Sequence, residues 1–217
     1  MVEGRAFPEV TALCEQRQVA VAVLPVDTLA EVIDPEVARG IVAQASPPRL
    51  FDLEDLLVAE SPRTRPASRR LLVALDGVVD PRNLGAILRS AEFFGAIGVF
   101  WAQDRAVGLT PAAVRASAGA SERVRIAVVG NLARALESCK RAEYWVVGTV
   151  VDDGRSLRDQ LSEGLPEDLV IVLGSEGKGL RRLTRERCDL LVRLEGAGEL
   201  GSLNVSAAAA ATLFALA

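Results

Sequence analysis

The sequence predicts an α/β protein: a parallel β-sheet flanked by helices. Continuous apolar runs such as LLVALDG (71–77) and DLVIVLG (168–174) have the pattern of strands buried on both faces. Amphipathic segments such as NLGAILRSAEFFG (83–95) separate these runs, so strands and helices alternate along the chain. Polar residues follow several of the runs, at the sheet edge where parallel α/β proteins bind their ligands.

Bulk composition sets limits on the class of protein. The chain has 217 residues, of which 50% are hydrophobic, and this suits one medium domain with a small second one. The net charge of −4 does not indicate nucleic-acid binding by the whole molecule, but it leaves room for a local basic surface. No apolar run approaches the roughly 20 residues that span a bilayer, and the N-terminus lacks a signal-peptide pattern. We therefore expect a soluble, cytoplasmic protein.

Cysteine and histidine usage narrows the chemistry. Cys14, Cys139 and Cys188 are far apart and odd in number, so a disulfide framework or a structural zinc site is not expected. The chain has no histidine, which excludes an imidazole base and a histidine metal ligand. Nothing in the sequence suggests a metal site.

Residues 1–60 are predicted to form a small N-terminal domain. Within it, VAVAVLP (19–25) and GIVAQA (40–45) have the pattern of short strands. DTLAEVI (27–33) is predicted as a short helix with Asp27 or Thr28 as its cap. The next segment, SPRTRPASRR (61–70), is predicted as an Arg/Pro linker, either a solvated tether or an arm that contacts phosphates.

Residues 71–217 are predicted to form the main α/β domain. Besides the two runs above, AIGVFWA (96–102) and YWVVGTVV (144–151) are strand candidates. NLARALESCKRA (131–142) lies between them and is predicted as a helix. The chain closes with SLNVSAAAAATLFALA (202–217), an Ala-rich helix with Ser202 or Asn204 as its cap.

A glycine-rich segment, GSEGKGL (174–180), follows one of the predicted strands. It does not match a phosphate-binding loop, because Val172 stands where that motif needs glycine and Gly179 where it needs Ser or Thr. It also lacks the start of the dinucleotide-binding fingerprint. Its glycines indicate either a plain tight turn or a close approach of the backbone to a ligand.

Three segments in order, LDGVVDPRNLGAILRSAEFFGA, LVIVLGSEGKGLRRLTRERCD and SLNVSAAAAATLFAL, strongly resemble the motifs of SpoU-type RNA 2′-O-ribose methyltransferases of the SPOUT superfamily. The resemblance covers about Leu71 to the C-terminus, and VRASAGA (114–120) is similar to a further stretch of that family. It implies a homodimer whose parallel sheet ends in a C-terminal trefoil knot. It also implies an S-adenosyl-L-methionine pocket in the knot, and that pocket would be lined by Leu173, Gly174, Leu194, Ser202 and Leu203.

The resemblance implies a catalytic centre made of Asn83, Arg89, Glu176, Ser202 and Asn204. In such a reaction a ribose 2′-oxygen attacks the methyl group on the cofactor's sulfonium. A guanidinium keeps its proton, so we expect Arg89 to orient and stabilise the 2′-oxygen rather than act as a base. Asn83 and Glu176 would hold that guanidinium. The proton would go to Glu176, an RNA phosphate or water.

The chain departs from the family in two places. Leu194-Glu195-Gly196 stands where members typically have Ile-Pro-Met, and the acid at 195 either alters cofactor binding or faces solvent. VEGR at the start and ARGIVAQA (38–45) are similar to the two ends of an L30-like RNA-binding domain, but the segment between them is short and acidic. Basic residues elsewhere are the alternative RNA-binding surface: Arg63, Arg65, Arg69, Arg70, Arg82, Arg115, Lys178, Arg181 and Arg182.

The sequence thus predicts S-adenosylmethionine-dependent methylation of a ribose 2′-hydroxyl in structured RNA. Ribosomal RNA is favoured over transfer RNA, because the resembled N-terminal domain is typical of ribosomal-RNA enzymes. Two rival functions stay open. One is a non-catalytic RNA-binding or assembly protein that has kept the knotted fold. The other, a nucleotide-dependent enzyme using residues 174–179, is disfavoured by the failed phosphate-loop spacing.

Overall fold

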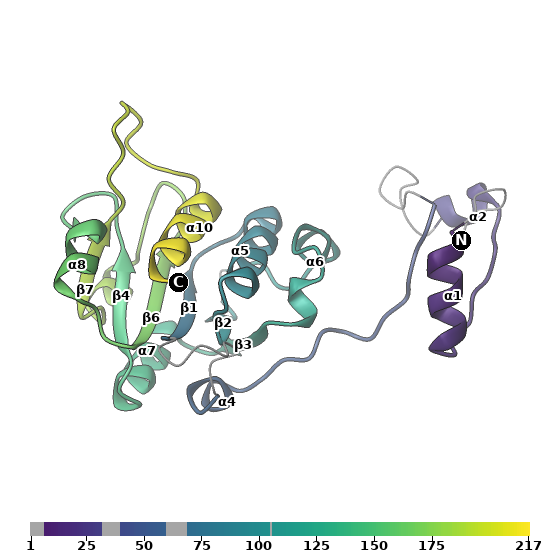
Figure 1. The fold of residues 1–217 in the computed structure, drawn as a ribbon, viewed down its shortest axis with the longest axis horizontal. Coiled ribbons are helices and arrows are strands. Elements are labelled where there is room, and N and C mark those ends of the chain that lie inside the picture. The colour runs from purple at the N-terminus through teal and green to yellow at the C-terminus, as the bar shows by residue number, and fades with distance from the viewer. Residues whose placement is uncertain (1–6, 32–39, 60–68, 105) are drawn as a thin grey trace. The chain divides into compact units, whose positions relative to one another are not determined.

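The computed structural model describes residues 7–31, 40–59, 69–104 and 106–217. The chain divides into two compact units, Met1–Pro47 and Pro48–Ala217 (Figure 1). No helix in the described part of the chain is long and apolar enough to cross a membrane.

The first unit contains the helices α1 (Pro8–Gln16) and α2 (Val26–Ala30). The predicted strands at 19–25 and 40–45 are wrong: neither segment forms a strand. Val19 and Val23 are 57% and 61% exposed, so this apolar run is not buried as a core strand would be. Within the described residues of this unit, Leu24 forms an isolated β-bridge, which is less than a strand. α2 begins one residue before the expected helix, whose last residues lie outside the described ones.

The second unit is built on a seven-stranded sheet in the order β3-β2-β1-β6-β4-β7-β5. All neighbouring strands pair in parallel, which confirms the predicted class. The predicted strands correspond to β1, β2, β4 and β6. The bounds are β1 Arg70–Asp76, β2 Gly98–Ala102, β3 Arg125–Val129, β4 Trp145–Thr149, β5 Arg155–Ser156, β6 Asp168–Gly174 and β7 Leu190–Arg193.

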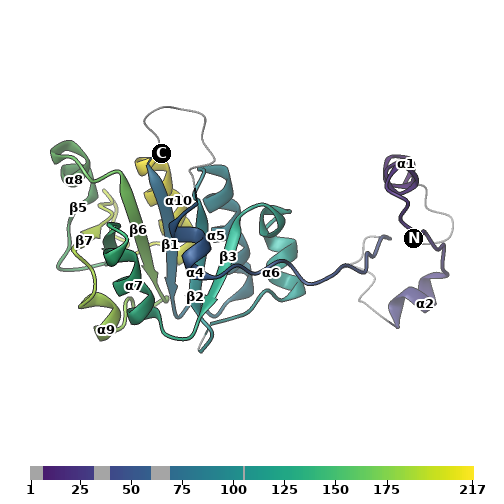
Figure 2. The same cartoon turned by 90° about the horizontal axis from the view of Figure 1, so that it is seen from below.

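Helices cover both faces of the sheet, as Figures 1 and 2 show. α5 and α10 pack side by side on one face, with α6 against α5, and α4 and α7 cover the other face. The three predicted helices of this unit are confirmed as α5, α7 and α10, and Asn204 rather than Ser202 caps α10. The bounds are α4 Leu53–Leu57, α5 Pro81–Phe93, α6 Pro111–Ala116, α7 Leu132–Arg141, α8 Leu157–Glu163, α9 Arg182–Arg185 and α10 Val205–Leu216, with a 3₁₀ turn at Ala120–Glu122.

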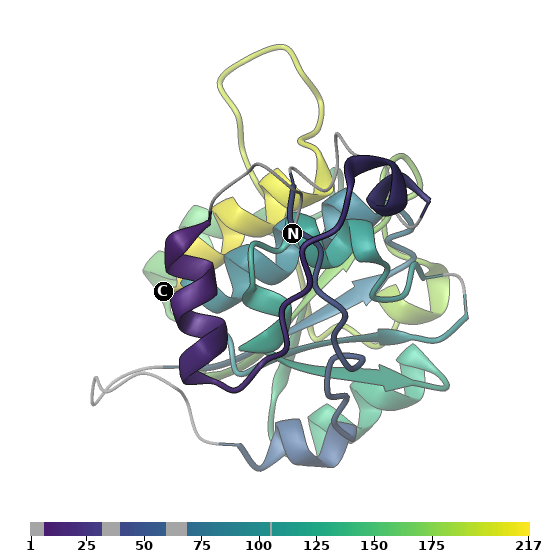
Figure 3. The same ribbon diagram turned by 90° about the vertical axis from the view of Figure 1, so that its right-hand side faces the viewer.

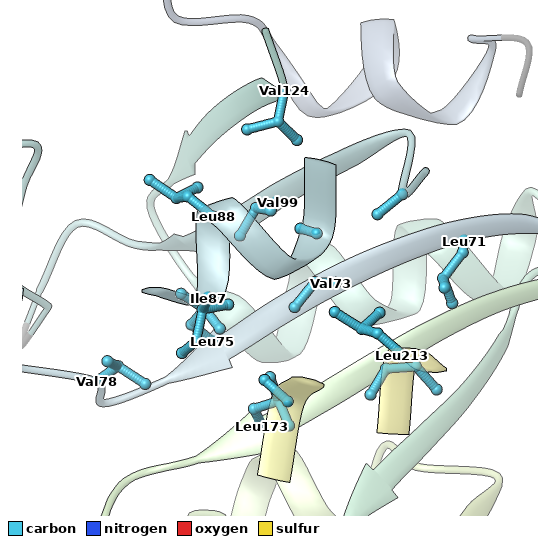
Figure 4. Close-up of a cluster of buried hydrophobic side chains, with 14 of the residues drawn as sticks. Leu71, Val73, Leu75, Val78, Ile87, Leu88, Val99, Val124, Leu173 and Leu213 are labelled. Atoms are coloured by element: carbon cyan, nitrogen blue, oxygen red, sulfur yellow. The ribbon is translucent and has the colours of Figure 1, made fainter. Parts of the chain in front are cut away.

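The inner residues of the central strand β1 are all apolar, and the packing on its two faces explains this. Successive side chains point to opposite faces of a strand. Leu71, Val73 and Leu75 therefore pack with Leu88 of α5 and Leu213 of α10 (Figure 4). The residues between them, Leu72 and Ala74, pack in the second cluster beneath α4 and α7. Both faces are buried, so every position between the strand's end residues, Arg70 and Asp76, is apolar.

The N-terminal boundary of the larger unit lies earlier than the sequence suggested. Residues 48–59 were assigned to the small domain, but Leu56 of α4 is fully buried in the core of the larger unit. The Phe51 N–H also donates to the Ile126 carbonyl at 2.8 Å, which adds this segment to the edge of β3. Apolar burial thus joins α4 to the sheet. Residues 61–68 of the predicted linker lie outside the described residues, and Arg70 is already part of β1.

Candidate active site

The site lies at the carboxyl ends of β1 and β6, which are neighbours in the middle of the sheet. From β1 the chain continues outward to β2 and β3, whereas β4, β7 and β5 lie beyond β6. The direction of chain progress therefore reverses between β1 and β6. Parallel α/β sheets bind ligands in the crevice outside such a switch point.

α5 begins directly after this edge. The Asp80 side chain accepts the Arg82 backbone N–H at 2.7 Å, and Pro81 occupies the first helical position. Both features favour a helix start here, because the first N–H groups of a helix need outside acceptors and proline cannot donate one. They place Asn83 in the first turn of α5, where it is 8% exposed.

Three predicted catalytic residues come together at this edge. The Asn83 Nδ2 donates to Glu176 Oε1 at 3.0 Å. The Asn204 Nδ2 donates to Asn83 Oδ1 at 3.1 Å and also to Glu176 Oε1. Asn204 meanwhile caps α10 through its Oδ1, which accepts the Ser206 N–H at 2.9 Å. Residues from all three sequence motifs thus form one amide–carboxylate cluster.

Glu176 is carried by a tight turn that explains the glycine-rich segment. The Gly179 N–H donates to the Ser175 carbonyl at 2.9 Å, and the Ser175 N–H donates to the Gly179 carbonyl at 3.2 Å. A Cβ on Gly174 would lie 2.3 Å from the carbonyl carbon of Gly179. Gly177 and Gly179 have φ of +76° and +63°. The chain's own backbone therefore requires these glycines, as the plain-turn alternative proposed.

Asp76 positions this turn and was not among the predicted site residues. Its side chain is fully buried at the end of β1 and pairs with the guanidinium of Arg181. Its Oδ2 also accepts the Arg181 backbone N–H at 2.8 Å. Asp76 thereby ties the end of the turn to the end of β1. The sequence did contain a signal for this role: Asp76 ends a continuous apolar run. A carboxylate at such a position is expected to be buried, and a buried acid usually has a partner.

Arg89 and Ser202 do not join the cluster. Arg89 is exposed on α5, six residues after Asn83, and its guanidinium forms no ion pair or hydrogen bond with any described residue. Asn83 therefore does not hold it, and neither does Glu176. Ser202 is exposed two residues before Asn204.

The five predicted cofactor residues divide between the ends of β6 and β7 and the loop before α10. Leu173 is buried and Gly174 half-buried at the end of β6, and Leu194 packs against the core. Ser202 and Leu203 are exposed, Leu203 by 55%. They belong to the loop between β7 and α10, which extends away from the sheet in Figures 1 and 3.

The loop from Glu195 to Leu203 has the chemistry to bind an adenosyl group. Its backbone groups form no hydrogen bond with other described residues, so they can bond to a ligand. Leu200 and Leu203 are 89% and 55% exposed and offer an apolar surface. A Cβ on Gly196, Gly198 or Gly201 would have nothing within 4 Å, so the loop backbone is open to close approach. These features fit S-adenosylmethionine, which combines an apolar-faced ring with many polar atoms.

Glu195 is held by its neighbours instead of simply facing solvent. Its Oε1 accepts from Arg193 Nη2 at 2.8 Å, and its Oε2 accepts from the Ser156 hydroxyl at 2.9 Å. These two hydrogen bonds, with Arg193 the larger cause, lower the pKa of Glu195. The side chain therefore ties the start of the loop to the start of α8.

Neither cysteine of the larger unit is a ready nucleophile. Burial raises the pKa of the Cys139 and Cys188 thiols to about 12 each, so both stay protonated near neutral pH. Within the cluster, the carboxylate of Glu176 is the group that can take a proton.

Known proteins resemble this chain over most of its length. A model described as the SpoU rRNA Methylase family matches residues 70–214. A 23S rRNA (guanosine-2′-O-)-methyltransferase RlmB from Pseudomonas putida is 44% identical over 181 residues, which are 82% of this chain and 69% of that protein. The RlmB of Pseudomonas syringae is 39% identical over 220 residues, 99% of this chain and 84% of that protein. The fold matches the AdoMet complex of the SpoU methyltransferase AviRb from Streptomyces viridochromogenes, with a TM-score of 0.75, 24% identity and coverage of 98% and 78% of the two chains.

Proposed function

Because this chain belongs to the SpoU rRNA methylase family, we propose that it methylates a ribose 2′-hydroxyl of 23S ribosomal RNA with S-adenosylmethionine. The observation that carries the proposal is the hydrogen-bonded cluster of Asn83, Glu176 and Asn204 at the switch point of the sheet. The names of the Pseudomonas relatives make a guanosine the first nucleotide to examine. Such a substrate makes the cytoplasm the expected location.

The cluster prepares Glu176 to accept the ribose proton. When bound, S-adenosylmethionine supplies a methyl group on a positively charged sulfur. Asn83 and Asn204 both donate to Oε1 of Glu176, whereas Oε2 has no partner among the described residues. Two donors on one oxygen fix the plane of the carboxylate and leave Oε2 to face the 2′-hydroxyl. The shared donors thus turn an exposed side chain into an oriented base.

Arg89 supplies positive charge to the 2′-oxygen. Its guanidinium keeps its proton at all relevant pH values, so it stabilises negative charge and does not accept the proton. Because the described residues leave this guanidinium without an ion pair, it is available to RNA. Single-turnover methyl transfer by Arg89→Lys tests the need for a planar fork of donors. Near-full activity of that variant would contradict the role.

The loop after β7 completes the cofactor site. We place the adenosyl group against Leu194, Ser202 and Leu203, with Leu173 and Gly174 at the end of β6. The proposed C-terminal knot would bring the loop over these residues as the chain passes from β7 to α10. Exposed leucines on the loop support this closure, because the cofactor would cover apolar area that now faces water.

A second copy of the chain is proposed to cover the ends of α5 and α10. Phe93 and Phe214 are 77% and 73% exposed there. Phe94 stands between them, with ring centroids 5.1 Å from Phe93 and 6.1 Å from Phe214. Exposed aromatic clusters of this kind mark protein interfaces. Sedimentation should show a dimer that Phe214→Asp converts to a monomer, and an unchanged mass would contradict this interface.

The N-terminal unit is proposed to bind RNA as an L30-like module. A deletion of residues 1–47 tests this, because removing 1–60 would also take the buried leucines of α4 from the core. Unchanged affinity for 23S RNA after the deletion would contradict the role.

Methyl transfer to unmodified 23S RNA tests the function itself. Purified protein, labelled S-adenosylmethionine and transcribed RNA should yield label in a dinucleotide that resists alkaline hydrolysis, because a methylated 2′-oxygen cannot attack the adjacent phosphate. Asn83→Ala should lose this activity, whereas Asn131→Ala, which removes the cap of α7 on the other face, should keep it. RNA binding without methyl transfer would favour the non-catalytic RNA-binding alternative.

A further inference from the structure

Some basic side chains of this chain form an ion pair or hydrogen bond within the described structure, and others, called uncommitted below, form none. Four of the candidates for an RNA-binding surface are already engaged. Arg70 pairs with Asp168, Arg181 with Asp76 and Arg182 with Glu186. The guanidinium of Arg69 donates to the carbonyls of Leu216 and Leu165 at 3.3 and 3.5 Å. These contacts reduce the capacity of these cations to bind phosphate, because an existing partner has to be released first.

Three other candidates are exposed and have no such partner. The side chains of Arg82, Arg115 and Lys178 form no ion pair or hydrogen bond with other residues that the structure describes. Arg89 has the same status. Unpaired surface cations cost little to bring to a phosphate, because no existing bond has to break.

The uncommitted arginines belong to two packed helices. Arg82 and Arg89 are seven residues apart on α5, so they share one face and stand about 10 Å apart along the helix axis. Gly85 lies between them, and a Cβ there would be 2.4 Å from the Ala113 carbonyl oxygen of α6. α6 therefore packs directly on this part of α5, as Figures 1 and 2 also show, and brings Arg115 next to the same contact.

The strip made by these cations begins at the catalytic cluster. Lys178 is in the turn that carries Glu176, two residues away. Glu176 in turn accepts from Asn83, the residue that follows Arg82. The lysine therefore adds positive charge at the end of α5 where the proposed base stands.

The acids at the start and near the end of α5, Asp80 and Glu92, bond to groups other than the side chains of the strip. The Asp80 carboxylate accepts the backbone N–H of Arg82 in its role as helix cap. Glu92, one turn beyond Arg89, faces Arg123 at 3.8 Å. The local balance on α5 and α6 is positive although the whole chain carries −4.

We propose that Arg82 and Arg115, with Lys178, form a phosphate-binding strip that holds consecutive nucleotides of the substrate RNA along α5 and α6, while Arg89 on the same face of α5 serves the ribose. The strip places one ribose at the cluster of Asn83, Glu176 and Asn204. This inference rests on the proposed function and names the surface through which that function selects and orients its RNA. Phosphate contacts of this kind set position and affinity rather than base specificity.

The salt dependence of RNA binding tests the strip. In the double variant Arg82→Gln/Arg115→Gln, two phosphate contacts are lost, so the slope of log affinity against log salt should fall by roughly 1.4 to 1.8. Binding of transcribed 23S RNA should weaken at least roughly tenfold at about 0.1 M salt. The matched control, Arg134→Gln/Arg141→Gln, makes the same charge change on α7, on the other face of the sheet. It should leave the slope as in the wild type.

Methyl transfer measured on the same proteins keeps the two proposals distinguishable. If the wild type methylates RNA and the strip variant binds with the wild-type slope, the strip is wrong and the function stands. The same conclusion follows if the control lowers the slope equally. If the wild type transfers no methyl group but the strip variant alone loses slope, the enzyme proposal fails and the RNA surface stands. Equal thermal unfolding midpoints of both variants and the wild type confirm that the comparison is between folded proteins.

Discussion

Removal of the Asp76 carboxylate is expected to loosen the turn that carries Glu176. Asp76 is 1% exposed and makes two contacts to Arg181, one to its backbone N–H at 2.8 Å and one to its guanidinium. In Asp76→Ala the backbone N–H loses its acceptor, which costs about 1–3 kcal/mol. The guanidinium is 41% exposed and regains water, so the total stays below the roughly 3–5 kcal/mol of a fully buried pair. We expect a loss of about 2–3 kcal/mol in the free energy of unfolding.

Asp76→Asn separates the charge from the hydrogen bond. Its amide oxygen still accepts the Arg181 N–H, so we expect a smaller loss of about 1–2 kcal/mol. Urea unfolding measures both variants. Single-turnover methyl transfer, measured under conditions where each variant is folded, should fall at least roughly tenfold, which corresponds to about 1.4 kcal/mol of transition-state stabilisation. Asp76 acts here through Glu176, so the RNA affinity should change little.

Asp168→Asn is the matched control for stability without positioning. Asp168 pairs with Arg70 at the start of β6, at the sheet edge opposite the site. This variant should lose about 1 kcal/mol of stability because its pair is partly exposed, yet keep the wild-type rate. A free energy of unfolding for Asp76→Ala within about 0.5 kcal/mol of the wild-type value would refute the anchoring role of Asp76. An equal loss of the methyl-transfer rate in Asp76→Ala and in the control Asp168→Asn would also refute it.

Three further predictions concern the turn, the base and the loop. Glu176→Gln keeps an oxygen for the asparagine donors but removes the proton acceptor, so the single-turnover rate should fall at least roughly hundredfold. Gly174→Ala places a Cβ 2.3 Å from backbone and should cost about 1–3 kcal/mol by urea unfolding, whereas Gly130→Ala, with nothing within 4 Å, should be near neutral. Hydrogen bonds from Arg193 and Ser156 lower the pKa of Glu195, so its stabilising contribution is present above the unfolded-state pKa and is lost as the pH falls through the folded-state value. Glu195→Gln should therefore lose less stability than the wild type as the pH falls below the ordinary glutamate pKa of 4.5.

Each of these measurements has a contrary result. A wild-type rate in Glu176→Gln would assign the proton to an RNA phosphate or water. A stable Gly174→Ala would mean that the turn can open without cost. Parallel acid titrations of the wild type and Glu195→Gln would mean that Glu195 contributes nothing to holding the loop.

The local pattern of the sequence was enough to predict most of the sheet and its class. β1 and β6 are continuous apolar runs, because both of their faces are buried, and such runs are visible in any one chain. The same rule failed at residues 19–25, where the apolar run forms no strand and Val19 and Val23 are exposed. Burial depends on what lies opposite, and a linear pattern does not contain that information.

The sequence by itself determined the family and the strand–helix alternation of the larger unit, and it singled out Asn83, Glu176 and Asn204 as site candidates, because each lies in a short motif. Only the tertiary structure decided that Asn83 and Asn204 donate to the same oxygen of Glu176. It also decided that Asp76 anchors the turn and that Arg89 lies outside the cluster. Asn83 and Asn204 are 121 residues apart in the chain and 3.1 Å apart in space. Hydrogen bonds act over a few ångströms, so the partners of each side chain depend on which strands are neighbours in the sheet. The strand order is established only when the chain has folded.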